Sequence, residues 1–222
     1  MSSLSLIINY LFMLTKKRIP LLIALICCVE LLIYLWAAWS TTFDKSNFFA
    51  IEPAFLFDKC ARNSGRISAV LFLIPLFMVG YYGLKEIYAD DKKRVSFLIL
   101  ITLFTINHLI HFLFLFLRFK NHETTLSIGE NLHGFITFMF IVIIPFFLWG
   151  YKNLNRLLYF VILLHLFNIS YFINKTFLGK VAPGHPAYHN QFGWVVITVA
   201  CLYILYRVYL ENKRNLQTNE YN

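Results

Sequence analysis

Six long apolar runs dominate this chain of 222 residues. Each run is long enough to cross the hydrocarbon layer of a bilayer, which takes about 20 apolar residues in a helix. Only 14% of the residues are charged, against about 25% in a soluble domain, so the chain cannot cover itself with a polar surface. The predicted spans are residues 20–39, 67–84, 95–117, 134–150, 157–174 and 193–210.

These runs predict helices. Backbone polar groups inside lipid must be satisfied internally, and the runs lack the alternating pattern of barrel strands. We therefore predict an all-α polytopic membrane protein, a six-transmembrane-helix bundle that forms a single domain over residues 1–222. Residues 1–19 are predicted to be an interfacial amphipathic segment. Its apolar residues recur at helical spacing: Leu4, Ile7, Ile8, Leu11 and Phe12.

The distribution of lysine and arginine predicts the orientation. Twelve of these residues fall on the side of the N-terminus and eight on the other side. The bias places both termini in the cytoplasm and the histidine-rich loops on the extracytoplasmic side of a plasma or inner membrane. The net charge of +9 indicates contact with anionic headgroups of the lipid bilayer, and no motif supports nucleic-acid binding.

Histidines inside the predicted spans are the first candidate functional residues. His108 and His111 lie one helical turn apart in the third span, and His165 lies in the fifth. An imidazole in the membrane interior is unfavourable unless something binds it. Two helices that each offer an imidazole at similar depth suit a haem held edge-on between them, with a histidine packed in the core as the alternative.

Other charged residues extend this set. Glu30 lies in the middle of the first span, where it is a candidate for a proton relay or for hydrogen-bonded contact between helices. Arg62 and Arg66 precede the predicted second span at the outer surface. Guanidinium groups there suit haem propionates, and plain interfacial anchoring is the alternative.

A second group of possible ligands gathers on the predicted outer side. Imidazole and carboxylate groups suit zinc or iron, so this group predicts an alternative non-haem metal site of an enzyme acting on lipid. A solvated loop is the simpler interpretation. The residues are Glu123, Glu130, His111, His133, His185 and His189.

Several short stretches follow one another over about residues 63–173: Ser64 to Ala69, Pro75-Leu76, Lys93-Arg94 leading to His108, Gly134 to Pro145, and Leu154 to His165. On these stretches rests a resemblance to the ferric reductase-like transmembrane haem domain. It implies a b-type haem held between histidines of the third and fifth spans.

The chain departs from the family pattern on the fifth span. Asn155 and Asn168 stand where the family has its two histidines, and His165 lies nearly one turn before the second. The resemblance therefore implies one haem at most. No dinucleotide-binding glycine motif is present, so electrons would come from quinol or a separate flavoprotein.

The sequence thus leads us to expect a haem-binding membrane electron-transfer subunit, possessing oxidoreductase chemistry and passing electrons to an outer acceptor. His108 and His165 are the expected axial ligands, with His111 or His133 as substitutes. Two alternatives remain open. One is the metal-dependent enzyme acting on lipid, and the other is a transporter or accessory protein whose histidines relay protons with Glu30.

Overall fold

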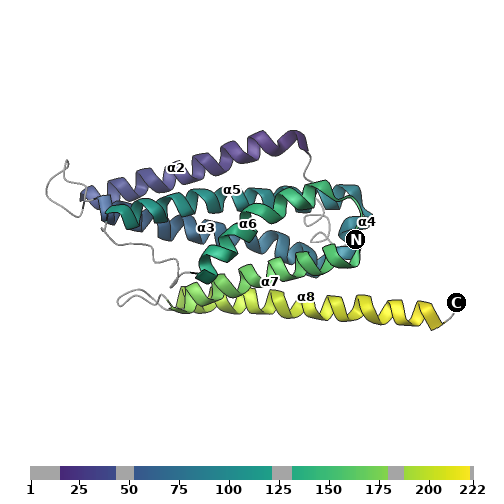
Figure 1. Cartoon of the computed structure of the whole chain (residues 1–222). Helices are drawn as coiled ribbons and strands as arrows, with labels where there is room; N and C mark the ends of the chain where they lie inside the picture. The colour runs from purple at the N-terminus through teal and green to yellow at the C-terminus, as the bar shows by residue number, and fades with distance from the viewer. Residues whose placement is uncertain (1–15, 44–52, 122–131, 180–187, 221–222) are drawn as a thin grey trace, which may run out of the picture. The chain divides into compact units, whose positions relative to one another are not determined.

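A computed structural model describes residues 16–43, 53–121, 132–179 and 188–220 of the chain (Figure 1). The regular structure in these residues is helical, which confirms the all-α prediction. The elements are η1 (Lys16–Arg18, a 3₁₀ turn), α2 (Ile19–Phe43), α3 (Pro53–Tyr82), α4 (Leu84–Ala89), α5 (Asp91–Asn121), α6 (Leu132–Gly150), α7 (Arg156–Gly179) and α8 (Tyr188–Glu220).

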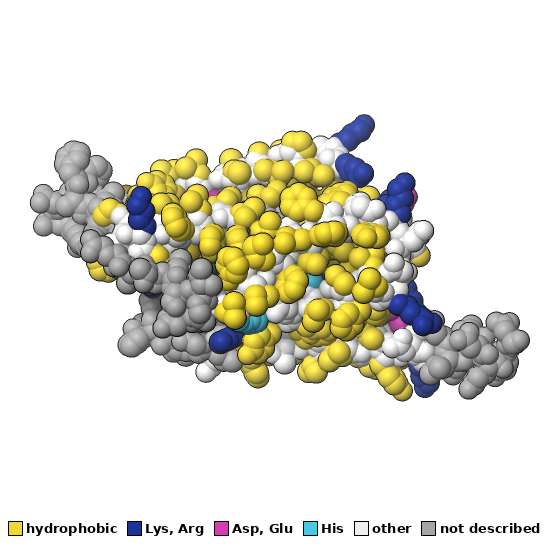
Figure 2. All heavy atoms as spheres, viewed as in Figure 1, with side chains coloured by type: hydrophobic (Ala, Val, Ile, Leu, Met, Phe, Trp, Pro, Cys, Tyr) yellow, Lys and Arg dark blue, Asp and Glu magenta, His cyan; other side chains and the backbone are white. Residues whose placement is uncertain are grey.

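Six of these helices are long and apolar enough to cross a membrane, and α4 is the short exception among the described α-helices. Side chains that a soluble protein would bury are exposed along them, as lipid-facing positions require. Phe146, Leu157 and Leu21 are 75%, 72% and 70% exposed. Figure 2 shows hydrophobic side chains over much of the visible face. The protein is therefore an integral membrane protein.

The second span differs most from its predicted limits. We expected it to begin at residue 67, whereas α3 begins at Pro53. Its first turns carry Asp58, Lys59 and Arg62, charged residues that lower the hydropathy of a window without opposing helix formation. Pro53 suits the first turn of a helix because its φ is already helical. Most of the predicted segment of residues 1–19 lies outside the described residues.

A glycine ends α3 and turns the chain into α4. Gly83 has φ 80° and ψ 153°, a conformation open to glycine and strained for other residues. It is the one glycine with positive φ among the described residues. A Cβ here would also meet Glu211 Oε1, so the Glu211 side chain would have to move to admit it.

The chain packs as two compact units. Unit 1 contains Leu73–Leu98 and Ile136–Asn222, and unit 2 contains Thr15–Phe72 and Ile99–Phe135. In unit 1, α7 and α8 pack side by side (Figure 1). In unit 2, an apolar cluster joins α2, α3 and α5. Its buried members are Ala37, Leu56, Cys60, Ala61 and Phe114.

Candidate functional site

Glu30 lies on the one narrow stripe of side chains that α2 buries. Ile26, Glu30, Ala37 and Thr41 are buried, and their spacing of four, seven and four residues puts them on one side of the helix. Most of the remaining side chains of α2 face outwards. Glu30 is 3% exposed, so its carboxyl group lies in the interior of unit 2 and does not face lipid.

The partner of Glu30 comes from α3. Ser64 Oγ donates a hydrogen bond of 2.8 Å to Glu30 Oε1, and Ser64 is fully buried. The thiol of Cys60, one turn earlier on the same face, lies near enough to interact electrostatically with Glu30. The bond links two spans. It also gives the carboxyl group a hydrogen-bond partner in the membrane interior, where water does not supply one.

A third helix, α5, contributes Asn107 to this group of hydrogen-bonded side chains. Asn107 Nδ2 donates to Ser68 Oγ at 2.8 Å and to the Ser64 carbonyl oxygen at 3.4 Å. Asn107 is fully buried, and its side chain also lies next to the Glu30 carboxyl group. The Ser64 and Ser68 side chains are four residues apart on α3, so both meet the same neighbouring helices.

The histidines of α5 continue the polar region. Gly65 makes room for His111, since a Cβ at Gly65 would lie 3.0 Å from His111 Cε1. The rings of His111 and His108 have centroids 5.3 Å apart, and the His108 ring lies 5.4 Å from that of Phe104. Imidazoles, a hydroxyl, an amide and a carboxyl group therefore gather where α2, α3 and α5 meet. We call Glu30, Ser64, Ser68, Asn107 and His111 the intramembrane polar centre.

Two buried acceptor atoms of this centre lack a donor. Within the described part of the chain, Glu30 Oε2 and Asn107 Oδ1 have no hydrogen-bond partner. A buried acceptor without a donor carries its full desolvation cost. A bound proton on the carboxyl group, a water molecule or a cation would each relieve this cost.

His165 belongs to unit 1, and His108 and His111 belong to unit 2. It is 3% exposed, and its Nδ1 has no hydrogen-bond partner among the described residues. The two asparagines at the family's histidine positions have structural partners. Asn155 Oδ1 accepts from the Leu158 N–H at 2.7 Å, which caps α7, and Asn168 Nδ2 donates to Thr137 Oγ1 of α6 at 3.1 Å.

Arg62 and Arg66 are engaged within α3. Arg62 Nη2 lies 2.6 Å from Asp58 Oδ2, and Arg66 Nη1 donates to Asn63 Oδ1 at 3.2 Å. Asp58 also binds Arg118 of α5, whose Nε lies 2.9 Å from Asp58 Oδ1. A haem propionate would have to compete with these partners for either arginine.

The second group of predicted ligands is described only in part. His133 lies in the first turn of α6, and His111 packs against Gly65 as above. Glu123, Glu130 and His185 lie outside the described residues, and His189 lies in α8. The described residues contain no group of three or more His, Cys, Asp or Glu side chains that could hold a metal ion.

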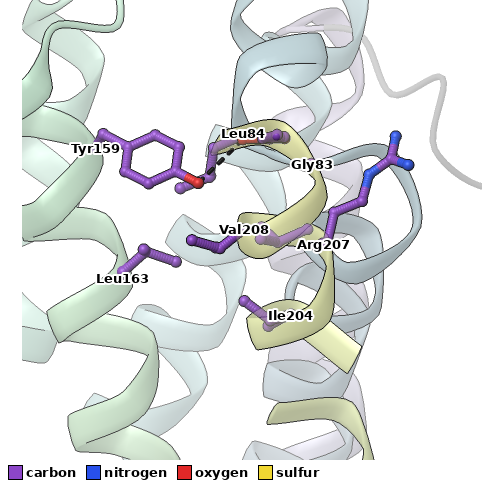
Figure 3. Close-up of a pocket in the computed structure, with 9 residues that line it drawn as sticks. Gly83, Leu84, Tyr159, Leu163, Ile204, Arg207 and Val208 are labelled. Atoms are coloured by element: carbon purple, nitrogen blue, oxygen red, sulfur yellow. Dashed lines mark hydrogen bonds between the residues drawn. The ribbon is translucent and has the colours of Figure 1, made fainter. Parts of the chain in front are cut away.

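Unit 1 contains a small crevice beside the Gly83 turn, between α7 and α8 (Figure 3). Tyr159 Oη donates to Glu211 Oε2 at 3.0 Å, and Arg207 Nη2 donates to the Tyr82 carbonyl oxygen at 2.8 Å. Arg207 therefore satisfies a carbonyl at the open end of α3, where a positive charge is favourable. The residues that line the crevice hold these helices together, and the crevice has little room for a ligand.

The sequence did not single out Ser64 and Ser68 as partners of Glu30. The spacing was the one signal for them, because Ser64 and Ser68 are four residues apart, as are Asn107 and His111 on α5. Neither Glu211 nor Tyr159 was identified, and no local pattern pairs residues so far apart in the chain.

Comparison with models of known protein families gave no match, and neither did comparison with characterised proteins or with solved structures.

Proposed function

We propose that this chain is an integral membrane protein that moves protons, and that Glu30 binds and releases the proton in the membrane interior. The observation that carries the proposal is the burial of the Glu30 carboxyl group among α2, α3 and α5. One oxygen is bonded to Ser64, and the other has no donor among the residues that the structure describes. Insertion of a carboxylate in mid-span costs roughly 2–3 kcal/mol, so its presence there points to a function.

The neighbours of Glu30 suit proton transfer. The Ser64 hydroxyl group both donates and accepts hydrogen bonds, and an imidazole ring can donate through one nitrogen and accept through the other. His111 packs against Gly65, next to Ser64 in the chain, and His108 follows it at 5.3 Å between ring centroids. In this proposal Glu30, His111 and His108 carry the proton, and Asn107 holds α3 in place.

Hydrogen-bonded contact between helices is the competing explanation, and a flux measurement separates the two. Purified protein is reconstituted into vesicles that contain a pH-sensitive dye, and a potassium diffusion potential drives proton entry. We expect proton flux for the native chain and the background of empty vesicles for Glu30→Gln, which keeps the hydrogen-bonding shape but cannot ionise.

Asn168→Ala is the matched control, because it removes another buried amide that bonds between helices, in unit 1. We expect it to retain the native flux. Equal flux in the native chain and Glu30→Gln would overturn the proposal, as would a native flux no greater than that of empty vesicles.

The orphaned Nδ1 of His165 favours a second candidate function, electron transfer through a b-type haem. A buried imidazole nitrogen without a partner fits an axial ligand, whereas the engaged Arg62 and Arg66 fit propionates less well. Haem would supply one-electron chemistry when bound. Quinol or a flavoprotein would be the electron donor.

An absorption spectrum before and after reduction with dithionite tests this candidate. Sharpened α and β bands in the native chain, lost in His165→Ala and retained in His185→Ala, would support haem binding. A featureless spectrum of folded protein from haem-replete cells would contradict it and leave proton movement as the account.

The predicted orientation belongs to the same proposal. Both termini are placed in the cytoplasm by the excess of lysine and arginine on that side. The histidine-rich loops then face the outside of a plasma or inner membrane.

A further inference from the structure

The oxygen atoms of the intramembrane polar centre could bind a metal cation as well as a proton. Glu30 Oε2 and Asn107 Oδ1 are both acceptors without a donor in the described residues, and both belong to residues that are 3% exposed or less. Hydroxyl oxygens of Ser64 and Ser68 lie beside them in the same network. All of these atoms are oxygens, the ligands that hard metal cations prefer.

The charge of the centre selects among cations. Glu30 is the one acidic side chain in it, and the other oxygens are neutral. A cation of single charge would leave the site neutral in a medium of low dielectric, whereas a divalent cation would leave an uncompensated buried charge. The imidazoles of His108 and His111 add no negative charge.

We propose that the intramembrane polar centre binds a small monovalent cation, such as sodium, in exchange for the proton of Glu30. The carboxyl group loses its proton as the cation binds, so the charge of the site is the same before and after the exchange. Asn107 is the residue that gives the site affinity for the cation, because its Oδ1 is the second orphaned acceptor. This inference rests on the proposed protonation of Glu30.

The test uses an apolar carbodiimide, dicyclohexylcarbodiimide, which modifies protonated carboxyl groups in apolar surroundings. Membranes containing the full chain are treated at mildly acidic pH in sodium chloride or in choline chloride of equal ionic strength. Mass spectrometry then measures the modified fraction at Glu30. The other titratable side chains at the centre are Cys60 from α3 and His108 and His111 from α5. Mass spectrometry must therefore identify which residue carries the modification.

We expect Glu30 to be modified in choline chloride and protected in sodium chloride. Asn107→Ala should still be modified but lose the protection, and Asn168→Ala should behave as the native chain. Glu30→Gln shows the background.

Modification of the native chain without protection by sodium would overturn the cation site and leave the proton-binding role of Glu30 intact. Absence of modification at Glu30 in both salts would contradict the protonation itself, and both proposals with it. Because the native chain gives these outcomes, the test does not depend on the folding of a variant.

Discussion

At the scale of single residues, Gly83 and Glu30 differ in how well the sequence predicts them. Glu30 is found from the sequence because a lone carboxyl group in an apolar run is unfavourable unless it has a role. Its bond to Ser64 depends on how two helices are rotated about their axes, and the hydropathy of the runs carries no such information. Gly83 lies at the end of a predicted span, and neither its positive φ nor its contact with Glu211 has a local signal.

Replacement of Gly83 by alanine should destabilise the protein. A residue with a side chain at this φ and ψ costs about 1–3 kcal/mol in backbone strain, and the new Cβ would also clash with Glu211. Thermal unfolding in detergent should show a clearly lower midpoint for Gly83→Ala. Gly150→Ala is the control, because nothing lies within 4 Å of a Cβ there. Equal midpoints for the two variants would show that the turn after α3 is not constrained as described.

At the scale of elements, pairs of helices are fastened by polar contacts that span the gap between them. Asp58 links α3 to α5 through Arg118, and Asn168 links α7 to α6 through Thr137. The sequence predicts the helices themselves because long apolar runs leave no other structure possible in lipid. It did not predict the start of α3, since the charged residues of its first turns resemble a loop in hydropathy.

Asp58→Asn should loosen the attachment of α3 to α5. The carboxyl group of Asp58 binds two arginines and its side chain is 20% exposed. Its loss should lower the free energy of unfolding by about 1 kcal/mol, the upper end of the range for exposed ion pairs. Asp91→Asn is the control, because Asp91 is 87% exposed and pairs with Arg94 inside the same helix.

Thermal unfolding of the two variants at low salt gives the comparison. We expect a lower midpoint for Asp58→Asn than for Asp91→Asn, and a smaller difference at high salt because exposed charges are screened. A larger loss of stability in Asp91→Asn would contradict the role given to Asp58.

At the scale of the whole molecule, six helices are long and apolar enough to cross a membrane. We predict that all six cross, which would put both ends of the chain on the same side of the bilayer. The excess of lysine and arginine predicts that this side is the cytoplasm. Reporter domains fused to either end, one active only in the cytoplasm and one active only outside it, test the prediction. Both fusions should be active with the cytoplasmic reporter. Opposite results at the two ends would mean that one of the six helices does not cross.

The division into two units is also a property of the whole molecule, and the sequence contained no sign of it. The helices α3 and α5 each contribute residues to both units. Composition and hydropathy describe each run separately, whereas the units arise from contacts among runs that are distant in the chain.

The most direct test of the account is a pH-dependent infrared difference spectrum of the purified protein in lipid. A protonated carboxyl group has a carbonyl stretching band that a carboxylate lacks, and an amide absorbs elsewhere. We expect a carbonyl band in the native chain that disappears as the pH rises, and the same spectrum without this band in Glu30→Gln. A pH-dependent band that persists unchanged in Glu30→Gln, or a native spectrum that never contains one beyond the exposed carboxyl groups, would contradict proton binding at Glu30.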